Sequence, residues 1–331
     1  MKRRTRQCGA ALLTAMIIVT LIASLAAGMV WQQYRAVQIE AAERARAQSG
    51  WILQGALDWA RLILKEDIRA DQSKPPIKDH LGEPWAVPLA EARLSTFLAA
   101  ERSNAADDDG PEAFLSGTIE DAQSRYNLRA LAAGPQVPPE EKLTLAQLCS
   151  QVNAPPGTDT VIIDGLRAAF PAAASSPAGP ASGPSTGPST NQAGPLQPAG
   201  LDQLSWLGLD ADTLKRLQPY VVLLPKDTPV NLNTAPREVI AALLNIDLAS
   251  AERIVQGRKG RPLQTIADAA ALLSPNFQIP PTRASVNSSF FIVTGRLRLE
   301  ERQLEQRSLV ERQGQGTVVL ARERISQLLD R

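Results

Sequence analysis

The sequence has few of the residues that most often carry out chemistry. Among its 331 residues it contains one histidine, His80, and two cysteines, Cys8 and Cys149. A single histidine disfavours a Ser-His-Asp triad and a two-histidine metal site. The sequence also lacks a Cys-x-x-Cys pair and a glycine-rich phosphate loop. We therefore predict that the protein is not an enzyme.

The sequence also lacks an excess of either charge. It has 35 Lys and Arg residues against 34 Asp and Glu residues, for a net charge of +1. Four of the positive charges belong to the first nine residues (Lys2, Arg3, Arg4 and Arg6), so subtracting them from +1 leaves −3 for the rest of the chain. Bulk attraction to nucleic acid requires a basic surface, and this charge balance argues against it.

A long uncharged segment follows the basic start of the chain. No charged residue occurs between Ala10 and Tyr34, and as a helix residues 10–30 would extend roughly 31 Å, enough to cross the hydrocarbon core of a bilayer. Basic residues beside a spanning helix stay in the cytoplasm. We therefore predict a single-pass inner-membrane protein with a cytoplasmic N-terminus and a periplasmic bulk; a simple anchor on an unrelated domain is the alternative.

The position of Gly9 distinguishes this segment from a secretory signal, whose small residues follow the apolar run. Here the small residue precedes that run, and the segment resembles type IV prepilins and pseudopilins. The resemblance implies that prepilin peptidase cleaves between Gly9 and Ala10, that Ala10 becomes N-methylated, and that residues 1–9 are a cytoplasmic leader. Cys8 would leave with the leader, so Cys149 is interpreted as a small buried apolar residue, with a reactive thiol as the alternative.

The fifth mature residue, counted from Ala10, is Thr14. Most pilins and pseudopilins have a glutamate there, which pairs with the N-terminal amine of a neighbouring subunit. An unpaired carboxylate among apolar helices is costly, whereas a threonine bonds to a carbonyl one turn earlier in its own helix. The substitution fits a subunit at a filament tip; an ordinary membrane-helix threonine is the alternative.

The rest of the sequence predicts an α+β fold. Apolar residues spaced three and four apart extend the first helix to about residue 66, a total of roughly 85 Å. Residues 67–127 and 282–331 are predicted to form a pilin-like α/β domain in which the long helix packs on an antiparallel sheet. Within it we expect a short helix at 89–100, a strand at 114–119 and a three-stranded C-terminal meander with a glycine-bearing turn at 313–316.

Residues 128–281 are predicted to form an inserted all-α domain. Residues 171–200 within it consist mostly of alanine, glycine, proline and serine and carry no charge. Such a segment cannot bury enough apolar surface to offset its ordering entropy, so we predict that it is disordered.

Three segments together resemble the K-type minor pseudopilin (GspK) family of type II secretion systems. The first is the leader with Thr14, the second is GTIEDAQSRYNLRAL at 117–131, and the third is PVNLNTAPREVIAALL at 229–244, followed by a Ser-x-Phe-type strand at 288–293. Within the second segment, Tyr126 and Arg129 depart from the Phe and Asn of the family pattern.

The resemblance implies a subunit at the tip of the pseudopilus that supports protein export across the outer membrane. Its implied partners are the I-type and J-type minor pseudopilins, the major pseudopilin, prepilin peptidase and the inner membrane, with the secretin or secreted substrates as further candidates.

Residues 230–270 also resemble a helix-hairpin-helix, which makes a membrane-anchored periplasmic DNA-binding protein the alternative function. Thr234 is expected to cap the first helix, with Pro236 in its first turn, and 249–257 to form the second. DNA-binding versions have a Gly-x-Gly hairpin that approaches a phosphate. Here the hairpin at 245–249 has no glycine and contains Asp247, so we predict no nucleic-acid partner.

Two acidic segments are candidate calcium ligands. Asp107, Asp108 and Asp109 are consecutive, and carboxylate oxygens are the ligands that Ca²⁺ prefers; a solvated loop is the alternative. Glu120 and Asp121 form the second candidate, with a cap or loop-fixing role as its alternative.

Overall fold

The computed structural model describes residues 8–73, 75–94, 113–170, 196–274, 276–299 and 302–328. The chain divides into two compact units, Met1–Gly55 and Ala56–Arg331. The predicted calcium ligands Asp107, Asp108 and Asp109, and residues 171–195 of the predicted disordered segment, lie outside the described residues.

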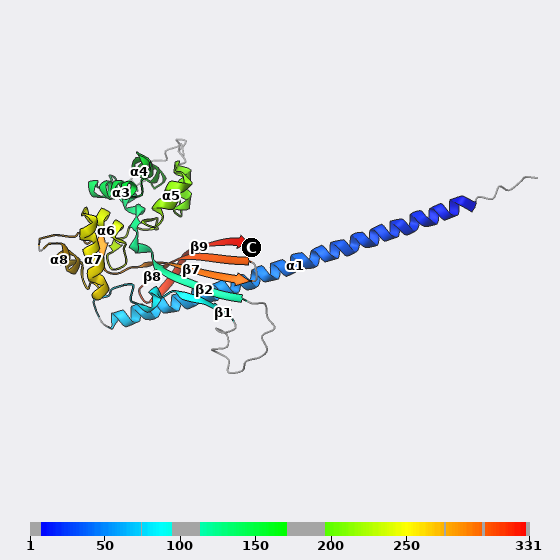
Figure 1. Cartoon of the computed structure of the whole chain (residues 1–331), viewed down its shortest axis with the longest axis horizontal. Coiled ribbons are helices and arrows are strands. Elements are labelled where there is room, and N and C mark those ends of the chain that lie inside the picture. The colour runs from blue at the N-terminus through cyan, green and yellow to red at the C-terminus, as the bar shows by residue number, and fades with distance from the viewer. Residues whose placement is uncertain are drawn as a thin grey trace, which may run out of the picture. The chain divides into compact units, whose positions relative to one another are not determined.

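A single long helix, α1, covers Cys8–Gln72 (Figure 1). It contains an apolar stretch long enough to cross a membrane, and the side chains of that stretch are exposed. The sequence predicted an end near residue 66, but the helix continues through one and a half further turns. No proline interrupts it before Pro75, and Asp67 in the added part forms an ion pair with Arg312. This tertiary contact, invisible to helical periodicity, holds the last turns.

An antiparallel sheet with strand order β1-β2-β7-β8-β9 forms the centre of the second unit (Figure 1). The predicted strand and C-terminal meander are confirmed, and Gly314 in the turn between β8 and β9 has a φ of 58°. The strand bounds are Leu89–Arg93 for β1, Ala113–Asp121 for β2, Phe290–Leu299 for β7, Arg302–Gln313 for β8 and Gly316–Leu328 for β9.

The prediction of a short helix at 89–100 was wrong at its start. Residues Leu89–Arg93 form strand β1, which pairs antiparallel with β2, joining Leu89 to Gly117 and Arg93 to Phe114. The local sequence, LAEAR, consists mostly of good helix formers. The backbone groups along the open edge of β2 provide partners that override this weak preference.

An apolar cluster lies on each face of the sheet. On one face, Leu57, Ala60 and Leu64 of α1 belong to a buried cluster that also contains Trp85 and Phe291. The rings of Trp85 and Phe291 meet edge to face, with their centroids 5.2 Å apart, a favourable geometry for two aromatic rings. On the other face, Phe290 packs in a second cluster with Val222 and Leu224.

The predicted helical insertion forms between β2 and β7. Its α-helices are Pro139–Gln151 (α3), Thr158–Ala169 (α4), Ala211–Leu217 (α5), Arg237–Leu244 (α6), Leu248–Gly260 (α7) and Ile266–Leu273 (α8). The short parallel pairs are Tyr126–Asn127 (β3) with Val221–Val222 (β4), and Val230–Asn231 (β5) with Ala284–Ser285 (β6). The insertion also contains the 3₁₀ turns Ala122–Ser124 (η2), Leu128–Ala132 (η3) and Asp202–Leu207 (η4), whereas the turn Pro84–Ala86 (η1) precedes β1.

The helices of the insertion share one hydrophobic core, to which α3, α4, α6 and α7 each contribute buried aliphatic side chains. Cys149 on α3 lies in this core and is free and buried. Burial raises the pKa of its thiol to about 12. The thiol therefore stays protonated, and its interpretation as a small buried apolar residue is confirmed.

The helix-hairpin-helix region is helical as predicted, but its caps differ. Helix α6 begins at Arg237 after Pro236, and no side chain caps it, so the expected cap by Thr234 was wrong. At the hairpin, Asn245 has a φ of 50°. Asp247 caps α7 by accepting hydrogen bonds from the backbone N–H and the hydroxyl of Ser250. The carboxylate of Asp247 in the hairpin thus caps the helix that follows it.

Candidate functional site

The two distinctive sequence motifs and the following strand meet at one buried carboxylate, Asp121. It ends β2, and its Oδ2 accepts hydrogen bonds from Asn231 Nδ2 (3.0 Å), Ser288 Oγ (2.6 Å) and Thr234 Oγ1 (2.5 Å). Its Oδ1 accepts from the backbone N–H of Gln123 (2.8 Å). We call Asp121, Gln123, Asn231, Thr234 and Ser288 the polar junction, because its hydrogen bonds include several between residues 57 to 167 positions apart in the chain.

Local sequence explains how the chain reaches this arrangement. Asp121 is the last residue of β2 and caps the turn η2, which directs Gln123 inward. The amide of Gln123 then donates to the carbonyl of Pro229 (2.9 Å) and accepts from the backbone N–H of Ser289 (2.6 Å). One side chain therefore links the segment that enters β5 to the segment that enters β7.

Buried asparagines extend these links into the insertion. Asn127 donates to the carbonyl of Lys226 (2.7 Å) and accepts from the backbone N–H of Leu224 (3.2 Å). Asn233 donates to the carbonyl of Leu263 (3.0 Å) and accepts from its N–H (2.9 Å). An amide side chain offers both a donor and an acceptor, so it can pair with a backbone segment as another strand would.

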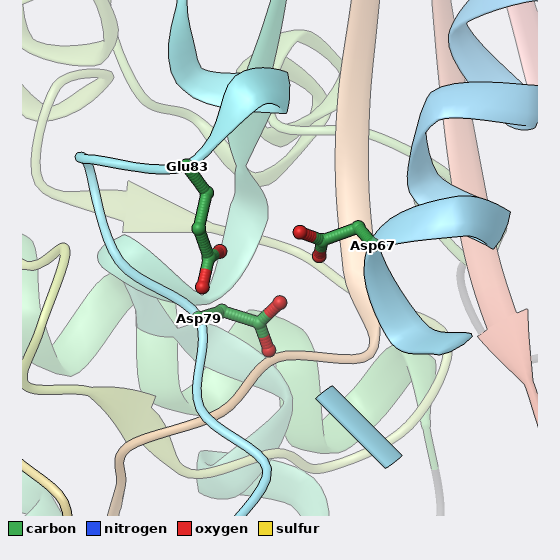
Figure 2. A group of neighbouring side chains, drawn as sticks. All are labelled: Asp67, Asp79 and Glu83. Carbon is green, nitrogen blue, oxygen red and sulfur yellow. The ribbon is translucent and has the colours of Figure 1, made fainter. Parts of the chain in front are cut away.

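A second polar group lies beside the junction, at the end of α1. The carboxylates of Asp67, Asp79 and Glu83 point toward one another (Figure 2), and oxygens of all three lie within 4.8 Å. Arg312 on β8 forms ion pairs with Asp67 (3.0 Å) and with Asp79. We call these four residues the acidic cluster. The guanidinium of Arg312 also stacks on the ring of Phe291, with its central carbon 4.5 Å from the ring centroid.

The acidic cluster and the polar junction share hydrogen bonds. The backbone N–H of Ser288 donates to Asp79 Oδ2 (2.7 Å), and Arg312 Nη2 donates to the carbonyl of Ser288 (2.7 Å). Asn231 donates to the backbone carbonyl of Asp79 (3.1 Å) as well as to Asp121. The two groups therefore form one continuous network between the end of α1, the sheet and the insertion.

Burial controls the protonation of this network. Loss of hydration raises the pKa of Glu83 to about 8, and the nearby charge of Asp67 raises it further. The hydrogen bond from Trp85 Nε1 acts in the opposite direction and lowers it. The same loss raises the pKa of Asp67 and of Asp121 to about 6, and raises that of Asp79. Glu83 thus holds a proton at neutral pH, which reduces the negative charge that Arg312 must balance.

Comparison with known proteins identifies the family. Two family models described as "Type II secretion system (T2SS), protein K" match residues 124–226 and 230–287. The chain belongs to this protein K family. The second match includes Asn231 and Thr234 of the polar junction. Asp121 and Gln123 lie just before the first match, and Ser288 lies just after the second.

Similarity to protein K relatives extends over nearly the whole chain. The protein K of Pseudomonas aeruginosa is 28% identical over 97% of this chain and 93% of the relative. The proteins K of Pectobacterium carotovorum and Klebsiella pneumoniae are 26% and 28% identical, over 97% and 96% of this chain and the same shares of the relatives.

A solved structure confirms the predicted fold class. The chain is similar to one in the crystal structure of the GspK-GspI-GspJ complex from the type II secretion system of enterotoxigenic Escherichia coli. The match has a TM-score of 0.62 and 19% identity, and covers 86% of this chain and 98% of that one. At this identity it shows the fold alone: a long helix on an antiparallel sheet, with a helical insertion.

Glu120 and Asp121, the described candidates for calcium in this protein K chain, have separate partners. Glu120 Oε2 pairs with Arg125 (2.5 Å) on a partly exposed surface, whereas Asp121 is buried among the donors of the polar junction. Neighbouring strand residues point to opposite faces, which explains the separation. Calcium binding at these residues stays a prediction.

The acidic cluster is the one group of described residues whose acidic oxygens lie close enough together to hold a metal ion. A calcium ion needs six to eight oxygen ligands at about 2.3–2.6 Å. Arg312 already binds Asp67 and Asp79, and Trp85 donates to Glu83. Because a cationic guanidinium sits among these oxygens, the cluster does not fit a metal.

The predicted processing and assembly residues lie in the first unit. Gly9 and Ala10 belong to the first turn of α1. The hydroxyl of Thr14 donates to the carbonyl of Ala11 (2.9 Å), the backbone bond anticipated from the sequence. The roles of all three in cleavage, methylation and assembly stay predictions.

Sequence reasoning missed the acidic cluster entirely. One signal was available for Arg312. In the predicted C-terminal strand it lies two residues after Val310, so strand alternation places this charged residue on the apolar face. A charge on such a face requires a buried partner.

Proposed function

We propose that this protein K chain is the subunit at the tip of a type II secretion pseudopilus. In this role it assembles with I-type and J-type minor pseudopilins, initiates the filament and supports export across the outer membrane. The observation that carries the proposal is the buried network around Asp121 and Arg312, because it fixes a bulky helical insertion onto the pilin-like sheet.

The insertion matters because of its attachment. A domain on a flexible linker could swing aside when the next subunit adds, whereas one held by buried hydrogen bonds cannot move without leaving polar groups unsatisfied. The network makes the insertion a fixed obstacle to addition of a further subunit beyond it. A subunit of this shape suits the end of a filament.

The hydroxyl of Thr14 supports the same assignment. It is hydrogen-bonded within its own helix, so it does not depend on the N-terminal amine of another subunit. The proposal includes cleavage between Gly9 and Ala10 by prepilin peptidase, N-methylation of Ala10, a periplasmic location for the part after the membrane helix, and contact with the major pseudopilin below. The secretin or secreted substrates are the proposed partners above.

The GspK-GspI-GspJ neighbour supports the choice of partners, because a protein of the same fold is found in complex with I and J proteins. The alternative, a DNA-binding role, receives little support from the hairpin, where Asp247 caps α7. A gel-shift assay on the full chain should detect no salt-sensitive DNA binding, whereas sub-micromolar binding would favour the alternative.

Labelling of sheared pseudopili tests the tip assignment. An epitope tag placed between residues 171 and 195 should bind gold-conjugated antibody at one end of each filament. Labelling along the filament length would contradict the proposal. Gly9→Val should abolish cleavage of the leader. The control is Gly28→Val in the same helix, where an added Cβ meets no atom within 4 Å beyond its own stretch of helix, and this variant should be cleaved as the unmodified chain is.

A further inference from the structure

The last strand of the sheet has an open edge. Strand β9 covers thirteen residues, Gly316–Leu328, and within the described part of the chain it pairs with β8 alone. The other edge strand, β1, has only five residues. Both edge strands contain one register shift, which in β9 falls between Val319 and Ala321. An exposed edge of this length is a ready template for another strand.

The register shows which backbone groups face outward. Arg312 lies opposite Thr317, yet its N–H donates in the other direction, to the carbonyl of Ser289 (2.7 Å). In an antiparallel ladder such a pair is the non-hydrogen-bonded kind, so the N–H and C=O of Thr317 point away from β8. Arg61 Nη2 reaches that carbonyl from outside (2.9 Å). Val319, opposite Val310, repeats the outward orientation by alternation.

The side chains of this edge change character along the strand. Residues 317–321 read TVVLA, with no charge and no proline, and Val318 and Leu320 are 42% and 40% exposed. Charges begin at Arg322, Glu323 and Arg324, all exposed. Charge, proline and β-bulges are the usual protections of an edge strand. The first half of β9 has neither charge nor proline, and its one protection is the register shift after Val319.

We propose that the open edge of β9 binds an extended strand of an I-type or J-type minor pseudopilin. The identity of the partner rests on the proposed function; the location of the contact rests on the sheet edge. Arg61 already donates to the carbonyl of Thr317, so the partner strand pairs with β9 from Val319 onward. Only another strand presents N–H and C=O groups at the spacing of an edge strand. The complementary strand is uncharged and β-branched opposite 319–321, and it carries a carboxylate opposite Arg322, which has no ion-pair partner among the described residues.

Hydrogen exchange on the full chain in detergent tests the contact directly, with and without the full-length I and J proteins of the same secretion system. In the isolated chain the amide of Val319 should exchange fast. In the complex, exchange in the segment 316–325 should slow at least about tenfold, because a new ladder protects it.

Charged substitutions provide the second arm. Val318→Lys with Leu320→Lys adds edge lysines at exposed positions, so the fold should persist, and affinity for the I and J proteins should fall at least about tenfold. The matched control is Leu81→Lys with Val87→Lys, also exposed (59% and 68%) and away from the edge, which should bind as the unmodified chain does.

The outcomes separate the two proposals. A complex that forms without protection of 316–325, or that tolerates the β9 lysines within twofold, would overturn the edge contact and leave the proposed function intact. Failure to form any complex would overturn both.

Discussion

The structure buries carboxylates in two neighbouring places and neutralises them differently. In the polar junction, Asp121 is surrounded by neutral donors from Gln123, Asn231, Thr234 and Ser288. In the acidic cluster, Asp67, Asp79 and Glu83 share one cation, Arg312, and a proton on Glu83. The first arrangement depends on the positions of many weak donors, and the second on one strong charge. The cluster should therefore be more sensitive to a single substitution and to pH.

The largest effect is expected from removing the cation. Arg312→Met keeps much of the side-chain volume over Phe291 but leaves Asp67 and Asp79 buried without their partner, and should lower the free energy of unfolding by about 3–5 kcal/mol. Denaturant unfolding in detergent measures the loss. Arg312→Lys, which keeps the charge but not the fork of donors, is the control and should lose less. An equal loss in both variants would show that geometry matters more than charge.

A smaller effect is expected at the polar junction. Asp121→Ala leaves four donors without their acceptor and should cost about 2–4 kcal/mol, since each unsatisfied buried donor is penalised. Asp121→Asn keeps one acceptor oxygen, so it should lose less stability than Asp121→Ala. Protease sensitivity of the segments entering the insertion should increase in the alanine variant. If Asp121→Ala cost more than Arg312→Met, the ranking of the two groups would be reversed.

The pH dependence should distinguish the two groups further. The native pKa of Glu83 is about 8, against an ordinary value of 4.5, so between these values the native state keeps a proton that the unfolded state has lost. The free energy of unfolding must then fall as pH rises through that window. Asp67 and Asp121, both with a pKa of about 6, contribute with the same sign between pH 4 and 6.

Thermal unfolding at pH 5 and pH 8 measures this dependence. The melting temperature should be several degrees higher at pH 5, since 1 kcal/mol corresponds to about 2–4 °C in a domain of this size. Glu83→Gln should remove most of the slope between pH 6 and 8, and below pH 6 it should leave only the part of the slope that comes from Asp67 and Asp121. A slope unchanged in that variant would contradict the proton on Glu83.

The smallest effect is expected at Cys149. Its thiol is buried with a pKa of about 12, so the folded chain should react with a maleimide far more slowly than the denatured chain. Cys149→Ala removes only one sulfur atom from the core and should cost about 1 kcal/mol. Rapid labelling of the native protein would revive the alternative of a reactive thiol.

Local pattern predicted much of this fold. Helical periodicity and the lack of proline predicted α1, and strand alternation with a glycine turn predicted β7 to β9. The helix expected at 89–100 failed because LAEAR has no local reason to be a strand. The cap expected at Thr234 failed because a hydroxyl near a helix start can bond elsewhere, here to Asp121.

The candidate site was foreseen only in part. Asp121, Asn231 and Thr234 belong to motifs that the sequence displays, but nothing in their spacing says that they meet. The acidic cluster combines residues from the end of α1, the following loop and β8, so only long-range packing reveals it.

The sequence by itself determined the long apolar helix, the predicted leader junction at Gly9, the threonine at position 14 and the order of helical and strand segments, because each depends on neighbours within a few residues. Tertiary structure decided the protonation of Glu83, the partners of Arg312, the role of Thr234 and the open edge of β9. Those properties depend on desolvation and on hydrogen bonds between residues as much as 256 positions apart, which no local pattern encodes.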